Sequence, residues 1–209
     1  MHISEGVAPI HIAIAGAVIA APCVAAGLGR LKDEHVPRAA IMASVLFVST
    51  IVVRLPIGPS SVHPLLGGLT GILLGWISMP VFLVSLFLQA LLFQFGGVTT
   101  LGINTVVMGL PAVAAWYICR TGLRDRGGTG KGFLWGFIAG ASAYMLSFGL
   151  WTLALVLCGS HLKTIAQIAL IPNAAVAVVE GIFTGFVARF LIKVYPSIFA
   201  ANGGAMRVE

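Results

Sequence analysis

The sequence predicts an all-α polytopic membrane protein with seven transmembrane helices, an external amino terminus and a cytoplasmic carboxy terminus. Hydrophobic residues make up 59% of the 209-residue chain and charged residues only 9%, whereas charged residues approach about a quarter of a typical soluble domain. Several windows hold the roughly 20 apolar residues needed to cross a bilayer. The net charge of +6 lies in the connections between these windows, so it indicates membrane topology rather than nucleic-acid binding.

Seven apolar segments follow one another along the chain with short polar connections. They run over Ile10–Leu28, Ala39–Leu55, Pro64–Ile77, Val81–Phe95, Ile103–Cys119, Gly132–Leu157 and Ile168–Ile192. The third and fourth segments are short and are separated by little more than Ser78, Met79 and Pro80. We therefore expect one transmembrane domain over residues 1–209, made of a metal-binding amino-terminal segment (1–9), a helical bundle (10–193) and a cytoplasmic tail (194–209).

Lysine and arginine residues set the expected orientation. If the amino terminus is external and every segment crosses once, Arg54 and Lys163 fall outside, and the other ten of the 12 basic residues fall on the cytoplasmic side. This asymmetry agrees with the positive-inside rule. The first seven residues contain no lysine or arginine, whereas a cleavable signal begins with a basic region, so we expect Met1 to be retained.

The amino terminus has the residue pattern of a metal chelate. The Met1 amine, the His2 backbone nitrogen and His2 Nδ1 can close five- and six-membered rings around one cation. These three nitrogens lie in a plane, and one more imidazole would complete a square. Tetragonal sites made of nitrogen favour Ni(II) or Cu(II) over Zn(II). The alternative is an arbitrary histidine in a frayed terminus.

His63 is the expected fourth nitrogen. It follows the external loop that begins at Arg54, and it precedes an apolar segment, so it lies on the same face as the terminus. Proline and glycine residues between positions 56 and 59 break the preceding helix. Ser60 or Ser61 is expected to cap the next helix, with Pro64 in its first turn. The alternative is a solvated polar cap in which the histidine binds nothing.

Further polar residues are expected around this site. Glu5 could accept a hydrogen bond from an imidazole N–H, while Ser61, Gln94 and Asn104 could help to orient the ligating rings, as metal-bound histidine usually requires. The alternative for the two amides is helix capping or bonding between helices. Glu180 lies inside the last apolar segment, where an ionisable group marks either function or a bond to a neighbouring helix.

Four stretches of this sequence carry a resemblance to a known family. They are MHISEGV at the start, GPSSVHPLLGG, LFQFGGVTTLGINTVVMGLPAV and VVEGIFTGFVARFL near the end. In these stretches, which cover nearly the whole chain in the family's order, the protein resembles CbiM and NikM, the metal-binding membrane subunits of energy-coupling-factor transporters. One departure is Asn173, which stands where the family often has a histidine at the start of the last helix.

The resemblance implies a six-helix substrate-binding core with one additional amino-terminal helix. It implies that Met1, His2 and the histidine matching His63 bind Ni(II) or Co(II) as the transported substrate. It also implies partners, namely a transmembrane coupling protein, two cytoplasmic ATPases and usually a small membrane accessory protein. We therefore expect a nickel-binding, alternatively cobalt-binding, subunit of an ABC-type importer in the inner (cytoplasmic) cell membrane, multi-pass and not an enzyme.

Two other functional classes are compatible with single features of the chain. An intramembrane hydrolase would use Ser61 and His63, although this pair is close along the chain and no suitably placed acid accompanies it. A stand-alone channel or ion-driven carrier would use Glu180 as its coupling site. The chain has no phosphate-binding loop of the G-x-x-x-x-G-K-[ST] kind, so we expect no bound nucleotide. Between the two metals, a square plane of strong nitrogen donors favours low-spin Ni(II).

Overall fold

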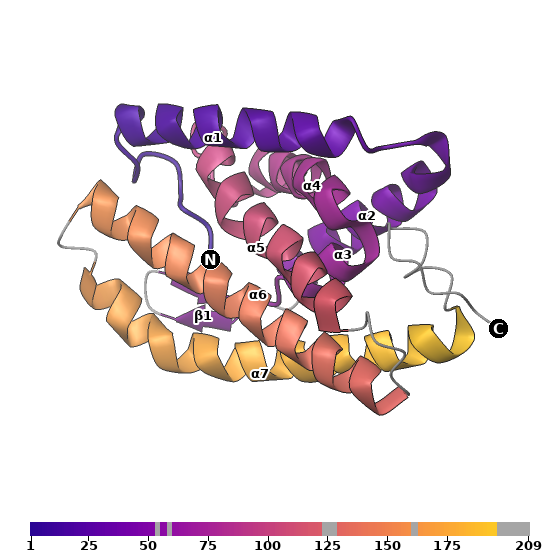
Figure 1. Ribbon diagram of the computed structural model, residues 1–209. Helices are drawn as coiled ribbons and strands as arrows, with labels where there is room; N and C mark the ends of the chain where they lie inside the picture. The colour runs from indigo at the N-terminus through magenta and orange to yellow at the C-terminus, as the bar shows by residue number, and fades with distance from the viewer. Residues whose placement is uncertain (53–54, 58–59, 123–128, 160–162, 196–209) are drawn as a thin grey trace.

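The computed structural model describes residues 1–209 except 53–54, 58–59, 123–128, 160–162 and 196–209. The described chain is almost entirely helical, as the composition predicted (Figure 1). Its helices are α1 (Ile10–Leu28), α2 (Val36–Val52), α3 (Gly67–Leu74), α4 (Ser78–Phe93), α5 (Leu101–Gly122), α6 (Thr129–Cys158) and α7 (Lys163–Val194), with 3-10 turns η1 (Asp33–His35) and η2 (Gly75–Ile77). Strands β1 (Leu55–Ile57) and β2 (Ser60–Val62) form one short antiparallel hairpin.

Six stretches of the described chain are long and apolar enough to cross a membrane, so this is a multi-pass membrane protein. Five of them contain α1, α2, α5, α6 and α7, and the sixth, Gly67–Phe93, combines α3, η2 and α4. Helix α3 alone has eight residues, which is about 12 Å at 1.5 Å per residue and well short of a hydrocarbon core of about 30 Å. The expected count of seven spans is therefore not confirmed and stays a prediction.

The chain turns sharply between α3 and α4. Gly75 has a φ of +56°, a conformation that a residue without a Cβ adopts readily. Just beyond it, Ser78 Oγ donates to the Thr70 carbonyl oxygen at 3.3 Å. Residues eight apart in one straight helix would lie about 12 Å apart, so α3 and α4 are not a continuous rod. The sequence placed the boundary at Ser78, Met79 and Pro80, but all three lie in the first turn of α4, where proline is tolerated.

Glycines bring α3 into close contact with α5 and α6. A Cβ added at Gly71 would overlap the carbonyl group of Ala112 in α5, and a Cβ at Gly68 would overlap the backbone of Gly140 in α6. Small residues of this kind let membrane helices approach closely. The residues just before α3 are therefore held at the meeting point of α5, α6 and α7, where the candidate site forms.

The amino-terminal segment runs from the start of α1 back into the bundle, and Figure 1 shows the chain end among the helices. Met1 and Ile3 are each 1% exposed. The hydroxyl of Tyr144 in α6 lies at the level of this site, near the backbone of His63. Helix α6 continues from Tyr144 to Cys158, about 21 Å at 1.5 Å per residue. The chain end is therefore recessed below the rim of the bundle.

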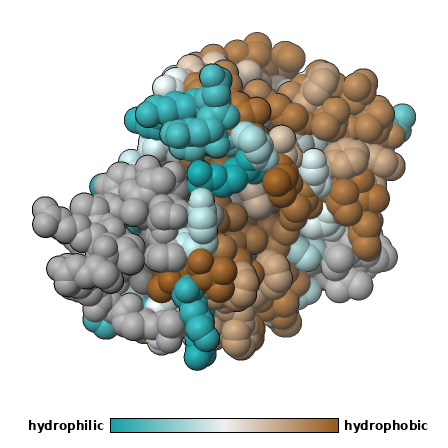
Figure 2. Space-filling model, turned by 90° about the vertical axis from the view of Figure 1, so that its right-hand side faces the viewer, coloured by the Kyte–Doolittle hydropathy of each residue, from teal (hydrophilic) through white to brown (hydrophobic). Residues whose placement is uncertain are grey.

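The described basic residues lie in or beside the helix ends at the opposite end of the bundle, which Figure 1 draws on the right. They are Arg30, Lys32, Arg38, Arg120, Lys131, Arg189 and Lys193. Arg30 lies over the ring of Trp76 with its Cζ 5.3 Å from the centroid, and Arg120 lies over Trp116 at 5.2 Å. Figure 2 looks onto this end and shows hydrophilic groups beside the hydrophobic sides of the bundle. Seven of the ten basic residues expected on one side thus share this end, while the side chains of Arg54 and Lys163 lie outside the described part of the chain and the orientation of the termini across a membrane stays a prediction.

The glycine contacts of α3 generate a prediction about stability. We expect Gly71→Ala to destabilise the protein by about 1–3 kcal/mol or more, the usual cost of overpacking, because the new Cβ would overlap the Ala112 carbonyl group. Gly149→Ala in α6 is the matched control, since a Cβ there meets nothing within 4 Å and alanine favours a helix. Thermal unfolding in detergent, followed by tryptophan fluorescence, measures both variants. Equal midpoints would contradict the close packing of α3.

Candidate metal centre

The backbone of Ile3 is held by side chains from the start of α5 and the loop before it. Ile3 N donates to Asn104 Oδ1 at 2.9 Å, and Asn104 Nδ2 donates back to the Ile3 carbonyl oxygen at 3.0 Å. Thr100 Oγ1 donates to the same oxygen at 2.8 Å. Asn104 therefore pairs with both polar groups of one residue, as a neighbouring β-strand would. Because unpaired backbone groups are costly inside a membrane protein, these bonds fix the register of the terminal segment.

This register brings the Met1 amine against His63. The amine nitrogen donates to His63 Nε2 at 2.9 Å, and the His63 side chain is almost fully buried. His63 Nδ1 lies 3.2 Å from the carbonyl oxygen of Pro64. If Nδ1 carries the proton and donates to this carbonyl, the lone pair of Nε2 is directed at the amine, because the bond made by one ring nitrogen sets the role of the other. Two nitrogens that can ligate a metal, the Met1 amine and His63 Nε2, thus face each other in the interior.

The ring of His2 completes the group. It stacks on the His63 ring with centroids 4.9 Å apart and an interplanar angle of 24°. Gly96, whose φ is +77°, lies beside it and makes room for Asn104, since a Cβ at this position would lie only 2.9 Å from Asn104 Nδ2 and at an ordinary contact distance of 3.6 Å from His2 Nδ1. The structure therefore brings together Met1, His2 and His63, the three residues expected from the sequence.

The set of candidate ligand nitrogens is unusual because only some of them belong to side chains. Among the described residues, no cluster of three or more His, Cys, Asp or Glu side chains is placed to hold a metal ion. The nitrogens gathered at this site instead include a terminal amine and a backbone amide, next to two imidazole rings. A set of nitrogen donors suits divalent ions from the later first-row transition metals better than it suits Mg²⁺ or Ca²⁺, which prefer oxygen ligands.

Glu180 of α7 supports the loop that carries His63. Its Oε1 accepts hydrogen bonds from the backbone N–H groups of Leu65 and Leu66, the second at 2.8 Å. Leu66 is the residue before α3, and its φ of 51° lies in the left-handed region that non-glycine residues rarely adopt. The carboxylate therefore takes the place of a cap at the start of α3, although it comes from the last helix of the chain.

The expected serine cap is not observed. Helix α3 begins at Gly67 with Leu66 before it and has no side-chain cap from its own segment. Ser60 and Ser61 lie in β2, where the chain pairs with β1 before it re-enters the bundle. The capping prediction was therefore wrong, because the helix starts later than Pro64. The side chain of Ser61 lies outside the part of the chain that the structure describes, so its predicted role near the metal is not tested.

Asn173 and Tyr144 form a second support beneath His63. The Tyr144 hydroxyl lies 2.8 Å from Asn173 Oδ1 and 3.4 Å from the carbonyl oxygen of His63. Asn173 Nδ2 donates to the Ala169 carbonyl oxygen at 2.7 Å, one turn earlier in α7. All three side chains, those of Tyr144, Asn173 and His63, are buried. The asparagine that departs from the family pattern thus links α7 to α6 below the site.

The other expected polar residues contact the backbone or the surface rather than an imidazole ring. The Glu5 carboxylate accepts hydrogen bonds from the backbone N–H of Thr99, at 3.3 Å, and from the Thr99 hydroxyl. Glu5 N also donates to the Gly96 carbonyl oxygen at 3.0 Å. Gln94 is exposed and ends α4 in a left-handed conformation, with a φ of 57°. Asn104 holds the Ile3 backbone. These contacts fasten the terminal segment to the bundle.

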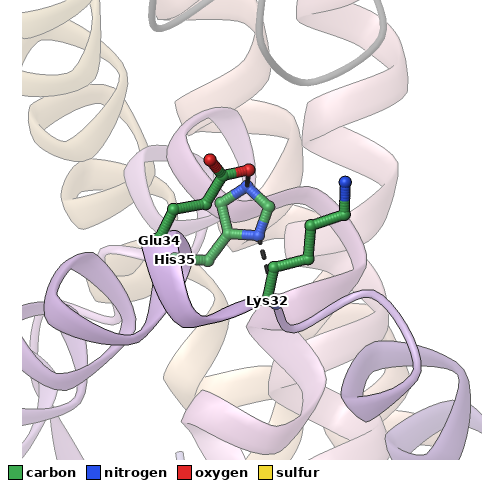
Figure 3. Close-up of polar contacts among 3 residues, drawn as sticks. All are labelled: Lys32, Glu34 and His35. Atoms are coloured by element: carbon green, nitrogen blue, oxygen red, sulfur yellow. Dashed lines mark hydrogen bonds and ion pairs between the residues drawn. The ribbon is translucent and has the colours of Figure 1, made fainter.

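The remaining histidines of the described chain lie away from this group. His11 is exposed on α1. His35 lies in η1, where its Nδ1 accepts a hydrogen bond from Lys32 N at 3.4 Å and its Nε2 is 3.6 Å from Glu34 Oε1 (Figure 3). This local cluster belongs to the basic end of the bundle. His161 lies outside the described residues.

Comparison with known proteins assigns the fold and the family. Residues 2–198 match the family described as "CbiM: Cobalt uptake substrate-specific transmembrane region". The chain belongs to the CbiM family. A Haemophilus influenzae protein named for metal transport is 37% identical over 200 residues, covering 95% of this CbiM chain and 96% of the relative. The resemblance found in the sequence is thereby confirmed, and the relatives of this CbiM protein are metal transporters.

Two further comparisons extend this assignment. A Methanocorpusculum labreanum protein, named as a fused cobalt transport protein CbiMQ, is 31% identical over 219 residues, covering 96% of this CbiM chain but 36% of the fused protein. A crystal structure of a transition metal transporter has the same fold, with a TM-score of 0.72 at 21% identity, covering 99% of this chain and 100% of that one. The fused relative is thus named for cobalt transport, and the solved structure shares the fold of this chain.

The amide clamp generates a prediction that requires no metal. We expect Asn104→Ala to release the terminal segment, because Ile3 then loses two buried hydrogen bonds, each worth about 1 kcal/mol net. The Met1 amine should then react with an acylating reagent about 30-fold faster, since the two bonds together are worth about 2 kcal/mol and roughly 1.4 kcal/mol corresponds to a factor of ten. Mass spectrometry of the amino-terminal peptide separates this reaction from that of lysines.

Thr99→Val is the control for that measurement. It removes the hydroxyl that contacts Glu5 at the exposed side of the segment and leaves the Ile3 clamp intact. We expect a smaller increase in the reaction rate of the Met1 amine. An Asn104→Ala protein that reacts as slowly as the wild type would contradict the proposed role of the clamp.

Proposed function

We propose that this protein is the substrate-capture subunit of a metal uptake system and binds Ni(II) through Met1 N, His2 N, His2 Nδ1 and His63 Nε2. The supporting observation is the distance of 2.9 Å between the Met1 amine and His63 Nε2. With metal–nitrogen bonds of about 2.0–2.1 Å, neighbouring corners of a square lie about 2.9 Å apart. The adjacent His2 ring is in reach of the next corner, and the His2 amide would occupy the last.

The choice of nickel rests on the chemistry of these donors. A chelate with a deprotonated backbone amide is a strong-field set of nitrogens, and a square plane of such ligands suits d⁸ Ni(II) and Cu(II) more than tetrahedral Zn(II). Co(II) is the second candidate, because the matching family is described as a cobalt uptake region and a relative is named for cobalt transport. Both ions would be cargo rather than a resident cofactor.

The proposed system places this chain beside other subunits. We infer a transmembrane coupling protein, two cytoplasmic ATPases and a small membrane accessory protein as partners in an energy-coupling-factor importer of the inner membrane. The match to only 36% of a fused relative supports a shared assembly, since that chain joins further sequence to a CbiM region. The basic end of the bundle, which faces the viewer in Figure 2, would face the cytoplasm and the terminal segment the exterior, as the positive-inside rule favours.

The rival functions receive little support from the geometry. A hydrolase needs a histidine nitrogen directed at its nucleophile, but His63 directs Nε2 to the Met1 amine and Nδ1 to a carbonyl oxygen. A carrier driven by Glu180 needs a carboxylate that exchanges partners, whereas this one caps the loop before α3. Capture of a cation by the terminal chelate would keep the Met1 amine and His63 next to each other, with the metal in place of the hydrogen bond between them.

The proposal predicts a strict requirement for the terminal amine. Acetylating Met1 or adding one residue before it should abolish high-affinity metal binding, because the amine would lose its basicity or be moved away from His63 Nε2. A tag at the carboxy terminus is the matched control and should leave the affinity unchanged. Isothermal titration of the purified protein with Ni(II) measures both. Equal nickel affinity in the extended and tagged proteins would exclude the amine as a ligand.

The proposal also predicts a spectrum and a pH dependence. Ni(II) bound by four nitrogens in a plane should be yellow and diamagnetic, with a single absorption band in the visible range. Binding displaces protons from an amine, an amide and protonated imidazole, so the affinity should rise with pH. Titrations with Ni(II) and Co(II) between about pH 6 and 8, where free amines and imidazoles titrate, measure this. A paramagnetic six-coordinate spectrum, or an affinity independent of pH, would rule out the chelate.

A further inference from the structure

We propose that Glu180 is a positioning residue that sets the direction of His63 Nε2 through the backbone of the loop between them. The inference rests on the proposed metal site, because it concerns how one ligand of that site is held. Glu180 itself contacts the amides of Leu65 and Leu66 rather than the imidazole ring. Its effect on the metal therefore has to pass through the chain that joins these amides to His63.

The loop offers a short and stiff connection. Leu65, whose N–H binds the Glu180 carboxylate, follows Pro64, and the ring of Pro64 fixes its own φ angle. The Pro64 carbonyl oxygen lies 3.2 Å from His63 Nδ1. A carbonyl held at this place selects both the rotation of the imidazole and the nitrogen that carries the proton. Anchoring Leu65 and Leu66 thus anchors the acceptor that orients the ring.

The conformation of Leu66 explains why an anchor is needed. Its φ of 51° is left-handed, which is unfavourable for a residue with a Cβ. The N–H groups of Leu65 and Leu66 also come before Gly67, where α3 begins, so no hydrogen bond within α3 can satisfy them. Without the carboxylate, the loop would relax toward a common conformation and take the Pro64 carbonyl oxygen with it.

A second contact holds the same loop from α6. The Tyr144 hydroxyl lies 3.4 Å from the His63 carbonyl oxygen. Helices α6 and α7 are themselves packed closely, since a Cβ at Gly140 would meet the Glu180 carbonyl oxygen and Thr184 Oγ1 within 3 Å. His63 is therefore held from below by one unit made of two helices, with Glu180 as the stronger of the two contacts.

The test compares Glu180→Ala, Glu180→Gln and Thr184→Val. Thr184 is buried on α7 one turn after Glu180 and contacts α6 rather than the loop, so its valine variant reports general damage to this helix. We expect Glu180→Ala to weaken Ni(II) binding about 10–100-fold, as losses of ligand-orienting residues do, and to shift the visible absorption band of the complex. Glutamine keeps an oxygen acceptor without the charge, so it should give a smaller loss and keep the wild-type band.

Thr184→Val should keep both the affinity and the band even if its thermal midpoint falls. This comparison separates positioning from stability, because a purely structural role would lower the midpoint without changing the spectrum of the bound ion. If Glu180→Ala does not fold, Glu180→Gln and Tyr144→Phe decide the matter, and both should bind Ni(II) more weakly than Thr184→Val. Affinities and bands equal to those of Thr184→Val would overturn the inference.

The variants His63→Ala and His35→Ala distinguish failure of the positioning role of Glu180 from failure of the proposed metal site. Loss of Ni(II) binding in His63→Ala, with wild-type binding in His35→Ala, supports the metal site whatever the Glu180 variants do. If that pattern holds and Glu180→Ala binds like Thr184→Val, only the positioning role is overturned. If His63→Ala binds Ni(II) as the wild type does, the metal site itself is wrong and the positioning role falls with it.

Discussion

An amino group buried among membrane helices must be matched by polar partners, and the position of the Met1 amine therefore constrains the segments that pack around it. The amine faces His63 Nε2 at 2.9 Å, and the residue Met1 is almost fully buried. The backbone behind it also enters the bundle, so the polar groups of Ile3 need partners of their own. Asn104 and Thr100 supply them. The terminal segment thus behaves as an additional strand whose partner is a pair of side chains.

The short helix α3 makes this insertion sterically possible. Because α3 begins only at Gly67, the volume before it is available to the chain end and to the loop of His63. Glycine contacts with α5 and α6 keep the helix in place, and the turn at Gly75 sends the chain away before a full span is made. A longer third helix would fill the space in which Met1 and His63 meet.

The sequence predicted the composition of the site better than its internal contacts. Apolar length located α1 at Ile10–Leu28, as observed, and chelate chemistry identified His2 and His63 because it depends only on residue type and position. The hydrogen bonds that Asn104 and Glu180 make depend instead on how segments distant in the sequence align when they pack together.

The errors follow from the same limit. A serine before an apolar run predicts a local cap, but the cap of α3 comes from Glu180, more than a hundred residues later. The sequence placed the boundary between the third and fourth apolar segments at Ser78, Met79 and Pro80, whereas the chain turns at Gly75, whose φ is positive. An asparagine near two histidines suggested ring orientation, yet the Asn104 amide matches a backbone amide more closely in geometry. Only the folded chain decides which of these partners a polar side chain receives.

The recessed position of the chain end has a kinetic consequence for the cargo. An ion bound by the proposed chelate could not leave until the terminal segment withdraws, and withdrawal breaks the hydrogen bonds made by Asn104, Thr100 and Thr99. Loss of the ion to a chelator in solution would then be a first-order process, with a rate set by the opening of the protein and independent of the chelator concentration. The same closure would keep bulk water from the coordination shell, so both entry and loss of the ion would be slow.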